Sequence, residues 1–95
     1  MSSIQLSRLR LPGQAKRDVA TREKELRKKM GYTQLRLAEK AGVSLGSLRR
    51  FEQTGDISFA SLVSIAYALG CQDELAHLFT KPAYRSIQEV LDEAR

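Results

Sequence analysis

The stretch Thr33–Gln53, which reads TQLRLAEKAGVSLGSLRRFEQ, decides the fold. It contains two short helical patterns that are separated by the turn sequence Ala41-Gly42-Val43-Ser44. Helices that meet at a steep angle need small residues where they touch, and Ala38 on the first helix meets that need. Gly42 can adopt the left-handed conformation that a tight turn requires. Leu48 falls on the inner face of the second helix, so we expect two helices packed around this turn.

This arrangement is a helix-turn-helix; the alternative is an ordinary pair of antiparallel helices in a bundle. A preceding helix is expected from Asp18 to Gly31, because one set of positions recurs at spacings of three and four: Val19, Glu23, Leu26 and Met30. The helix after Thr33 is expected to carry Leu35, Ala38 and Ala41 on one face. Hydroxyl residues that can cap the successive helices are Thr33, Ser44 and Ser58.

The second half of the chain predicts further short helices. The helix that follows Ser58 has an apolar face made of Leu62, Ile65, Ala66 and Leu69, and Ile57 can pack against Leu62. Another helix is expected over Asp73–Phe79, and Ser86 with Glu89 forms a capping box for a sixth helix or a tail that folds on a partner. The fold class is therefore all-α: a bundle of about five short helices with a C-terminal helix or tail.

Composition excludes several classes of protein. The chain has 95 residues and 42% hydrophobic content, enough for one compact domain with a core. No apolar run approaches the ~18–20 residues that span a bilayer, and no secretory signal is expected. With Cys71 and His77 as the only cysteine and histidine, we expect no catalytic residue, no metal site and no cofactor. These features fit a reducing cytoplasm.

Charge is distributed unevenly along the chain. Residues 1–53 hold 13 Lys/Arg and 5 Asp/Glu, a balance of +8, whereas residues 54–95 hold 3 and 6, a balance of −3. A basic half favours a polyanionic partner, although a solvated basic face is the alternative.

Three segments are expected. Residues 1–17 form a basic N-terminal arm or a strand that pairs only with a partner, since residues 4–11 alternate in polarity and Pro12-Gly13 is expected to break the chain. Residues 18–80 form the helical domain, and residues 81–95 form the tail.

Several motifs of the sequence resemble the Cro/C1-type (XRE-like) helix-turn-helix family over roughly Thr21–Phe79. The motifs are Gly31-Tyr32-Thr33-Gln34 with Leu37-Ala38, then Ala41-Gly42-Val43-Ser44, Leu48-Arg49-Arg50-Phe51-Glu52, and Ile65-Ala66-Tyr67-Ala68-Leu69-Gly70. The resemblance implies a lambda-repressor-like bundle that binds double-stranded DNA. It also implies that Gln34 contacts a DNA phosphate and that Arg27 and Glu52 form a structural salt bridge.

A rotation of 100° per residue assigns the faces of the second helix, with Leu48 and Phe51 pointing inward. Residues on the opposite side or at its margin are expected to contact base edges in the major groove: Leu45, Gly46, Ser47, Arg49, Arg50 and Gln53. Arg49 and Arg50 lead this set, because arginine can donate two hydrogen bonds to guanine. The alternative is a solvated arginine face. Expected phosphate contacts are Thr33, Gln34, Ser44, Thr54 and Ser58.

The sequence leaves three functions open. The first is a transcriptional repressor that binds a two-fold operator as a homodimer. The second is a HipB-like antitoxin that binds its own operator and a HipA-type kinase toxin, a weaker resemblance based on residues 50–55. The third is a protein-interaction module without DNA binding. An enzyme is not expected, because the chain has no Gly-rich phosphate loop.

Two segments compete as the dimer or partner surface. One is the acidic half, with Leu75, Leu78 and Phe79 and the apolar residues Ile87, Val90 and Leu91. The other is the N-terminal segment from Ile4 to Leu11. Alternatively, these residues complete the core of the monomer.

Overall fold

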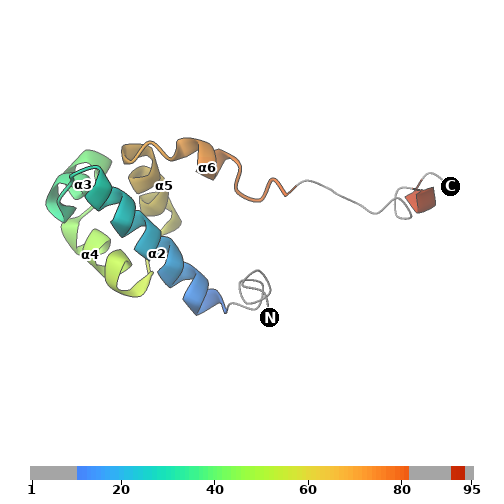
Figure 1. Cartoon of the computed structure of the whole chain (residues 1–95), viewed down its shortest axis with the longest axis horizontal. Coiled ribbons are helices and arrows are strands. Elements are labelled where there is room, and N and C mark those ends of the chain that lie inside the picture. The colour runs from blue at the N-terminus through green and yellow to red at the C-terminus, as the bar shows by residue number, and fades with distance from the viewer. Residues whose placement is uncertain (1–10, 82–90, 94–95) are drawn as a thin grey trace.

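The computed structural model describes residues 11–81 and 91–93, and this part of the chain is a bundle of short helices (Figure 1). The helices are α2 (Pro12–Lys29), α3 (Gln34–Ala41), α4 (Leu45–Thr54), α5 (Phe59–Ala68) and α6 (Gln72–Ala76). Residues 91–93 are also helical, and none of the described residues lies in a strand. The predicted all-helical bundle with a helix-turn-helix is confirmed.

Helix α2 begins six residues earlier than the sequence analysis expected, at Pro12 instead of Asp18. Proline at the first helical position is favourable, because its fixed φ suits a helix and its missing N–H has no partner there. Gln14 Oε1 accepts a hydrogen bond from the N–H of Leu11 at 3.0 Å, which closes the first turn. The prediction that Pro12-Gly13 breaks the chain is therefore wrong, and residues 12–17 belong to the bundle.

The tight connections form as their sequences predict. The hydroxyl oxygens of Thr33, Ser44 and Ser58 each accept a hydrogen bond from a backbone N–H in the first turn of α3, α4 and α5. Gly42 ends α3 in the left-handed conformation, with φ 70°. The Val43 N–H then donates to the carbonyl of Ala38 at 3.0 Å, so the chain turns directly from α3 into α4.

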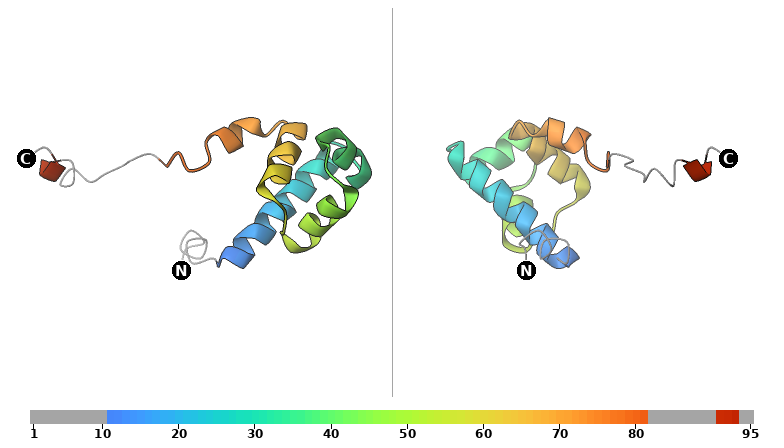
Figure 2. Two further views of the ribbon diagram at one scale, coloured as in Figure 1. Left: turned by 180° about the vertical axis from the view of Figure 1, so that it is seen from behind. Right: turned by 45° about the vertical axis from the view of Figure 1, so that its right-hand side comes forward.

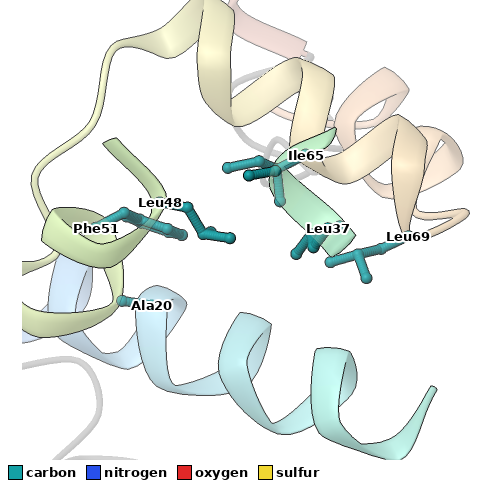
Figure 3. Packing of buried hydrophobic residues seen from close by; sticks show 7 residues of the cluster. Ala20, Leu37, Leu48, Phe51, Ile65 and Leu69 are labelled. Carbon is teal, nitrogen blue, oxygen red and sulfur yellow. The ribbon is translucent and has the colours of Figure 1, made fainter. Parts of the chain in front are cut away.

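The core lies where four helices meet. Helix α4 packs against α2 and α3, α3 also packs against α5, and α6 packs against α5; Figure 2 shows this arrangement from two further sides. The largest fully buried side chains are Leu37, Leu48, Phe51 and Ile65. Figure 3 shows Leu48 and Phe51 projecting from α4 toward Leu37 and Ile65, with Ala20 of α2 close to Phe51. Each such side chain contributes about 1.5–3 kcal/mol through burial.

Two positions of the expected apolar faces are wrong. Leu35 is 54% exposed, and Leu37 is fully buried in its place. The buried face of α3 is centred between Leu37 and Ala38, and Leu35 lies roughly 110° away from that centre. Met30 is exposed because α2 has already ended at Lys29.

Helix α6 is shorter than the expected helix Asp73–Phe79. It ends at Ala76, after which Leu78 and Thr80 donate turn hydrogen bonds to Leu75 and His77. Phe79 has φ 64° and is 94% exposed, so it neither continues the helix nor joins the core.

Some predictions concern residues that the structure does not describe. The alternating residues from Ile4 to Arg10 and the capping box of Ser86 and Glu89, with Ile87 and Val90, lie outside the described ranges. Leu91 is described and is exposed.

Gly55 fixes the start of α2 against the end of α4. It is buried, has φ 83°, and a β-carbon built on it would lie 2.9 Å from the carbonyl carbon and Cγ of Lys16. The obstacle is backbone as well as side chain, so it cannot move aside cheaply. Glycine at this position thus satisfies both a left-handed backbone and a close approach of two segments.

This double requirement is testable with three glycine-to-alanine variants. In Gly42→Ala the only cost is the strain of an alanine in the left-handed conformation, because nothing lies within 4 Å of the added β-carbon. This variant should lower the free energy of unfolding by about 1–2 kcal/mol. Gly55→Ala should lower it further, because the clash with Lys16 is added. Gly46→Ala, within α4 and in open space, should leave it unchanged or raise it by up to about 1 kcal/mol. Urea unfolding measures all three, and equal losses at Gly42 and Gly55 would contradict the close approach.

Candidate nucleic-acid interface

Helix α4 has one buried face and one exposed face. Leu48 and Phe51 are buried, whereas Arg49, Arg50 and Gln53 are exposed. Of the other expected base-contact residues, Gly46 is exposed, and Leu45 and Ser47 are half-buried at the margins. The outer face of α4 therefore carries two guanidinium groups and one amide, all able to donate hydrogen bonds. Contact of these residues with DNA stays a prediction.

The two arginines differ in their surroundings. Arg50 Nη2 lies 3.6 Å from Asp56 Oδ2, and Asp56 Oδ1 accepts a hydrogen bond from Lys16 Nζ at 2.5 Å. Arg49 forms no ion pair with any described residue. The Arg50 side chain is still 71% exposed, so Asp56 restricts its direction without covering it.

The link between Lys16 and Asp56 was not foreseen from the sequence. The positive charge and hydrogen bond of Lys16 hold the pKa of the Asp56 carboxyl below its ordinary value, and Arg50 has a smaller effect in the same direction. These residues are forty positions apart, and the local pattern around each is only that of a charged surface residue. The close approach at Gly55 brings them together. A turn glycine next to Asp56 was the one available signal, and it did not identify the partner.

Five hydroxyl groups lie near α4, and they differ in whether the hydroxyl proton is already donated within the chain. Thr33 and Ser58 use their oxygens to accept N–H groups at helix starts, so their own O–H groups remain able to donate. Ser44 instead donates to Ser47 Oγ at 2.8 Å, which leaves the donor at Ser47. Thr54 donates to the carbonyl of Arg50 at 2.8 Å.

This division changes the expected phosphate contacts. Ser44 and Thr54 already use their hydroxyl protons within the chain, so in this arrangement neither has an O–H to donate to a phosphate. Thr33, Ser47 and Ser58 keep theirs. Contact of any of these hydroxyl groups with a phosphate stays a prediction.

A shallow groove lies beside the exposed face of α4. It has a volume of about 320 Å³ and is lined by Ser47, Arg50, Asp56, Ile57, Ser58 and Ser61. Its walls come from α4, the following loop and the first turn of α5. Free N–H groups at a helix start favour an anion, so the groove brings donors from three segments to one place.

Helix α4 is fixed to the rest of the bundle by a buried salt bridge. Arg27 of α2 donates from Nε and Nη2 to the two carboxylate oxygens of Glu52 at 2.8 and 2.9 Å. Arg27 Nη1 also donates to the carbonyl of Tyr32 at 2.8 Å. The paired side chains are 8% and 2% exposed, and the geometry is bidentate, which is the strong form of this interaction.

Gln34 joins the same cluster. Its Nε2 donates to Glu52 Oε1 at 3.0 Å, so the side chain implied to contact phosphate also connects α3 to α4. One amide hydrogen is used in this bond, and the second remains for a phosphate. Burial by itself raises the pKa of Glu52, but the hydrogen bonds donated by Arg27 and Gln34 help to outweigh it, and the pKa lies below its ordinary value. Glu52 is therefore ionised.

Within residues 11–81 and 91–93, no group of three or more His, Cys, Asp or Glu residues is placed to hold a metal ion. Cys71 is half-buried and unpaired, and His77 is exposed, with Nδ1 2.7 Å from the carbonyl oxygen of Asp73. Among the described helices, none has both the length and the apolar character needed to cross a bilayer.

We expect Arg27→Met to destabilise the protein by about 3–5 kcal/mol, because it leaves the Glu52 carboxylate buried without its partner. Arg22→Met, an exposed arginine on the same helix, is the matched control and should change stability by less than about 0.5 kcal/mol. The double variant Arg27→Met/Glu52→Leu should recover part of the loss. Urea unfolding gives each value, and similar stabilities for both single variants would show that the buried pair does not fix α4.

Comparison with known proteins agrees with this geometry. No curated protein and no solved structure gives a significant match. The profile of the helix-turn-helix family matches residues 24–75, which span the last third of α2 through most of α6. That range is more than half of the chain and contains the turn at Gly42, the buried pair of Arg27 and Glu52, and α4. The chain belongs to the Cro/C1-type helix-turn-helix family of DNA-binding regulators.

Proposed function

We propose that the chain is a sequence-specific transcriptional repressor that binds a two-fold operator as a homodimer, with α4 in the major groove. The observation that carries this proposal is the outer face of α4, where Arg49, Arg50 and Gln53 are exposed while the opposite face is locked into the core. One such helix reads few base pairs, so useful affinity requires two copies one turn of DNA apart.

In this proposal, the predicted base-contact residues of α4 have defined roles. Arg49 and Arg50 donate to guanine O6 and N7, and each bidentate contact is worth about 1–3 kcal/mol of discrimination. Gln53 lies on the same exposed face and can bond an adenine. Leu45 at the margin contacts a thymine methyl, and Gly46 allows the backbone to come close to the bases.

Phosphate contacts position α4 on either side of the groove. Thr33 and the free amide hydrogen of Gln34 meet one strand at the start of α3, and Ser58 meets the other at the start of α5. Ser47 adds a donor from α4. The basic balance of residues 1–53 supports this placement, because those residues include α2, α3 and nearly all of α4.

A second candidate function is that of an antitoxin, which binds a toxin of the HipA kinase type and represses its own operon. The observation that favours it is the apolar surface at Leu78 and Phe79, which are 46% and 94% exposed. This surface follows α6, at the end of the bundle away from α4 (Figure 1), so a partner there leaves α4 open to DNA. A kinase encoded beside this chain that copurifies with it, and that Phe79→Ala releases, supports this candidate.

Selection from random duplex DNA at two salt concentrations tests the proposed function. A repressor of this type enriches a two-fold site with half-sites one helical turn apart, and its affinity falls steeply as salt rises. Failure to enrich any site at either concentration means that the fold serves as a protein-interaction module instead.

Arg50→Ala should weaken binding to the selected operator by about 5- to 150-fold, the equivalent of one lost bidentate contact, and relax the preference at one base pair. The fold should be unaffected, because the Arg50 side chain is mostly exposed. Arg22→Ala removes a positive charge from an exposed site on α2 and controls for net charge. A fluorescence anisotropy titration measures both, and equal affinities for the two variants would refute the assignment of the reading face.

Gln34→Ala should instead weaken binding to operator and to random duplex by the same factor, because a phosphate contact carries no base information. Its bond to Glu52 is lost as well, so urea unfolding is measured in parallel, and binding is compared at a temperature where both proteins are folded. A loss confined to the operator would contradict the phosphate role.

A further inference from the structure

One buried carboxyl group is unexplained by the salt bridge that fixes α4. Glu23 of α2 is 8% exposed, and no described residue donates a hydrogen bond to either of its carboxyl oxygens. A buried carboxylate without a donor is strongly unfavourable. Glu23 must therefore be satisfied in another way, or it is not ionised.

The carboxyl group of Glu52 on α4 lies within hydrogen-bonding reach of Glu23, and the charges of Arg27 and Lys24 also act on it. Both oxygens of Glu52 already accept hydrogen bonds, from Arg27 and Gln34, so Glu52 is the ionised member of the pair. Two carboxylates cannot bond to each other, because both are acceptors, but one proton between them turns one carboxyl into a donor. The proton then resides on Glu23.

We propose that Glu23 is a protonated positioning residue, whose O–H donates to the Glu52 carboxylate and, together with Arg27 and Gln34, fixes the orientation of α4. Glu52 then receives donors from α2 and α3 at once, and no buried charge is left without a partner. This hydrogen bond stabilises the contact between α2 and α4, and it thereby fixes the orientation of the exposed face of α4.

The charges around Glu23 define its titration. Burial, followed by the hydrogen bond and the negative charge of Glu52, raises the pKa of Glu23 to about 8, against the opposing effects of Arg27 and Lys24 on its own helix. Since the ordinary value is 4.5, Glu23 is ionised in the unfolded chain at neutral pH and protonated in the folded one. Folding between these values takes up a proton.

The sign of the pH dependence follows from this uptake. A raised folded-state pKa means that the stabilisation from Glu23 is complete below pH 4.5 and is lost as pH rises through about 8. Within that window the folding equilibrium constant falls about tenfold for each pH unit from this group. Above it, two adjacent carboxylates repel each other across the contact between α2 and α4.

Urea unfolding of the full chain from pH 5.5 to pH 9 tests the proposal. Glu23→Gln keeps a neutral donor toward Glu52 and removes the titration, and Glu25→Gln, an exposed glutamate on the same helix, is the matched control. We expect wild type and Glu25→Gln to lose folding stability together as pH rises. The folding equilibrium constant of Glu23→Gln should fall less steeply, and the difference from wild type should approach tenfold for each pH unit below pH 8. Glu23→Gln should be the most stable of the three proteins at pH 9. Parallel profiles for all three proteins would overturn the proposal.

A second measurement needs no variant. The side-chain carboxyl carbon of Glu23, followed by NMR in the folded wild-type protein, should titrate near pH 8, well above the ordinary glutamate value of 4.5. Titration of Glu23 near 4.5 would overturn the proposal even if Glu23→Gln failed to fold.

The consequence for DNA rests on the proposed function. Operator affinity of the wild type should fall more between pH 7 and pH 9 than that of Glu23→Gln. If neither protein binds DNA, the proposed function fails, while the unfolding and NMR results still decide the role of Glu23.

Discussion

The buried pair of Arg27 and Glu52 is the interaction on which the rest of the structure depends. It joins the second half of α2 to the end of α4, and through the carbonyl of Tyr32 and the amide of Gln34 it reaches the connection into α3 and its first residue. Three helices therefore meet at one carboxylate. A salt bridge of this kind is costly to desolvate, so its value lies in specifying a single geometry as much as in stability.

That geometry determines what α4 can do. With Glu52, Leu48 and Phe51 held inward, the helical rotation leaves the arginines outward. The same packing brings Lys16 against Gly55 and to Asp56 Oδ1, while Asp56 Oδ2 lies 3.6 Å from Arg50 Nη2. The direction of the exposed Arg50 side chain thus depends on a contact between the start of α2 and the end of α4.

Much of this could be predicted from the sequence, because its signals are local. Caps at Thr33, Ser44 and Ser58, the left-handed glycine at the turn and the rotation of α4 depend on residues within a few positions of each other. The errors also have local causes. Pro12-Gly13 predicts a break where α2 in fact begins, and the pattern after Thr33 predicts an inward Leu35 on a helix too short to define its face well. The contacts of Glu23 with Glu52 and Lys16 with Asp56 join distant segments, and only the packed bundle reveals them.

The central claim is that an arginine on the outer face of α4 reads a guanine, and one measurement tests it most directly. Guanines of the selected operator are replaced one at a time by 7-deazaguanine, which lacks the N7 acceptor, and wild type is compared with Arg50→Ala. The account predicts one position at which the 7-deazaguanine replacement lowers the affinity of wild type but does not lower the affinity of Arg50→Ala any further. At that position the effects of the base change and of the Arg50 substitution are therefore not additive. Equal losses for both proteins at every guanine would contradict it.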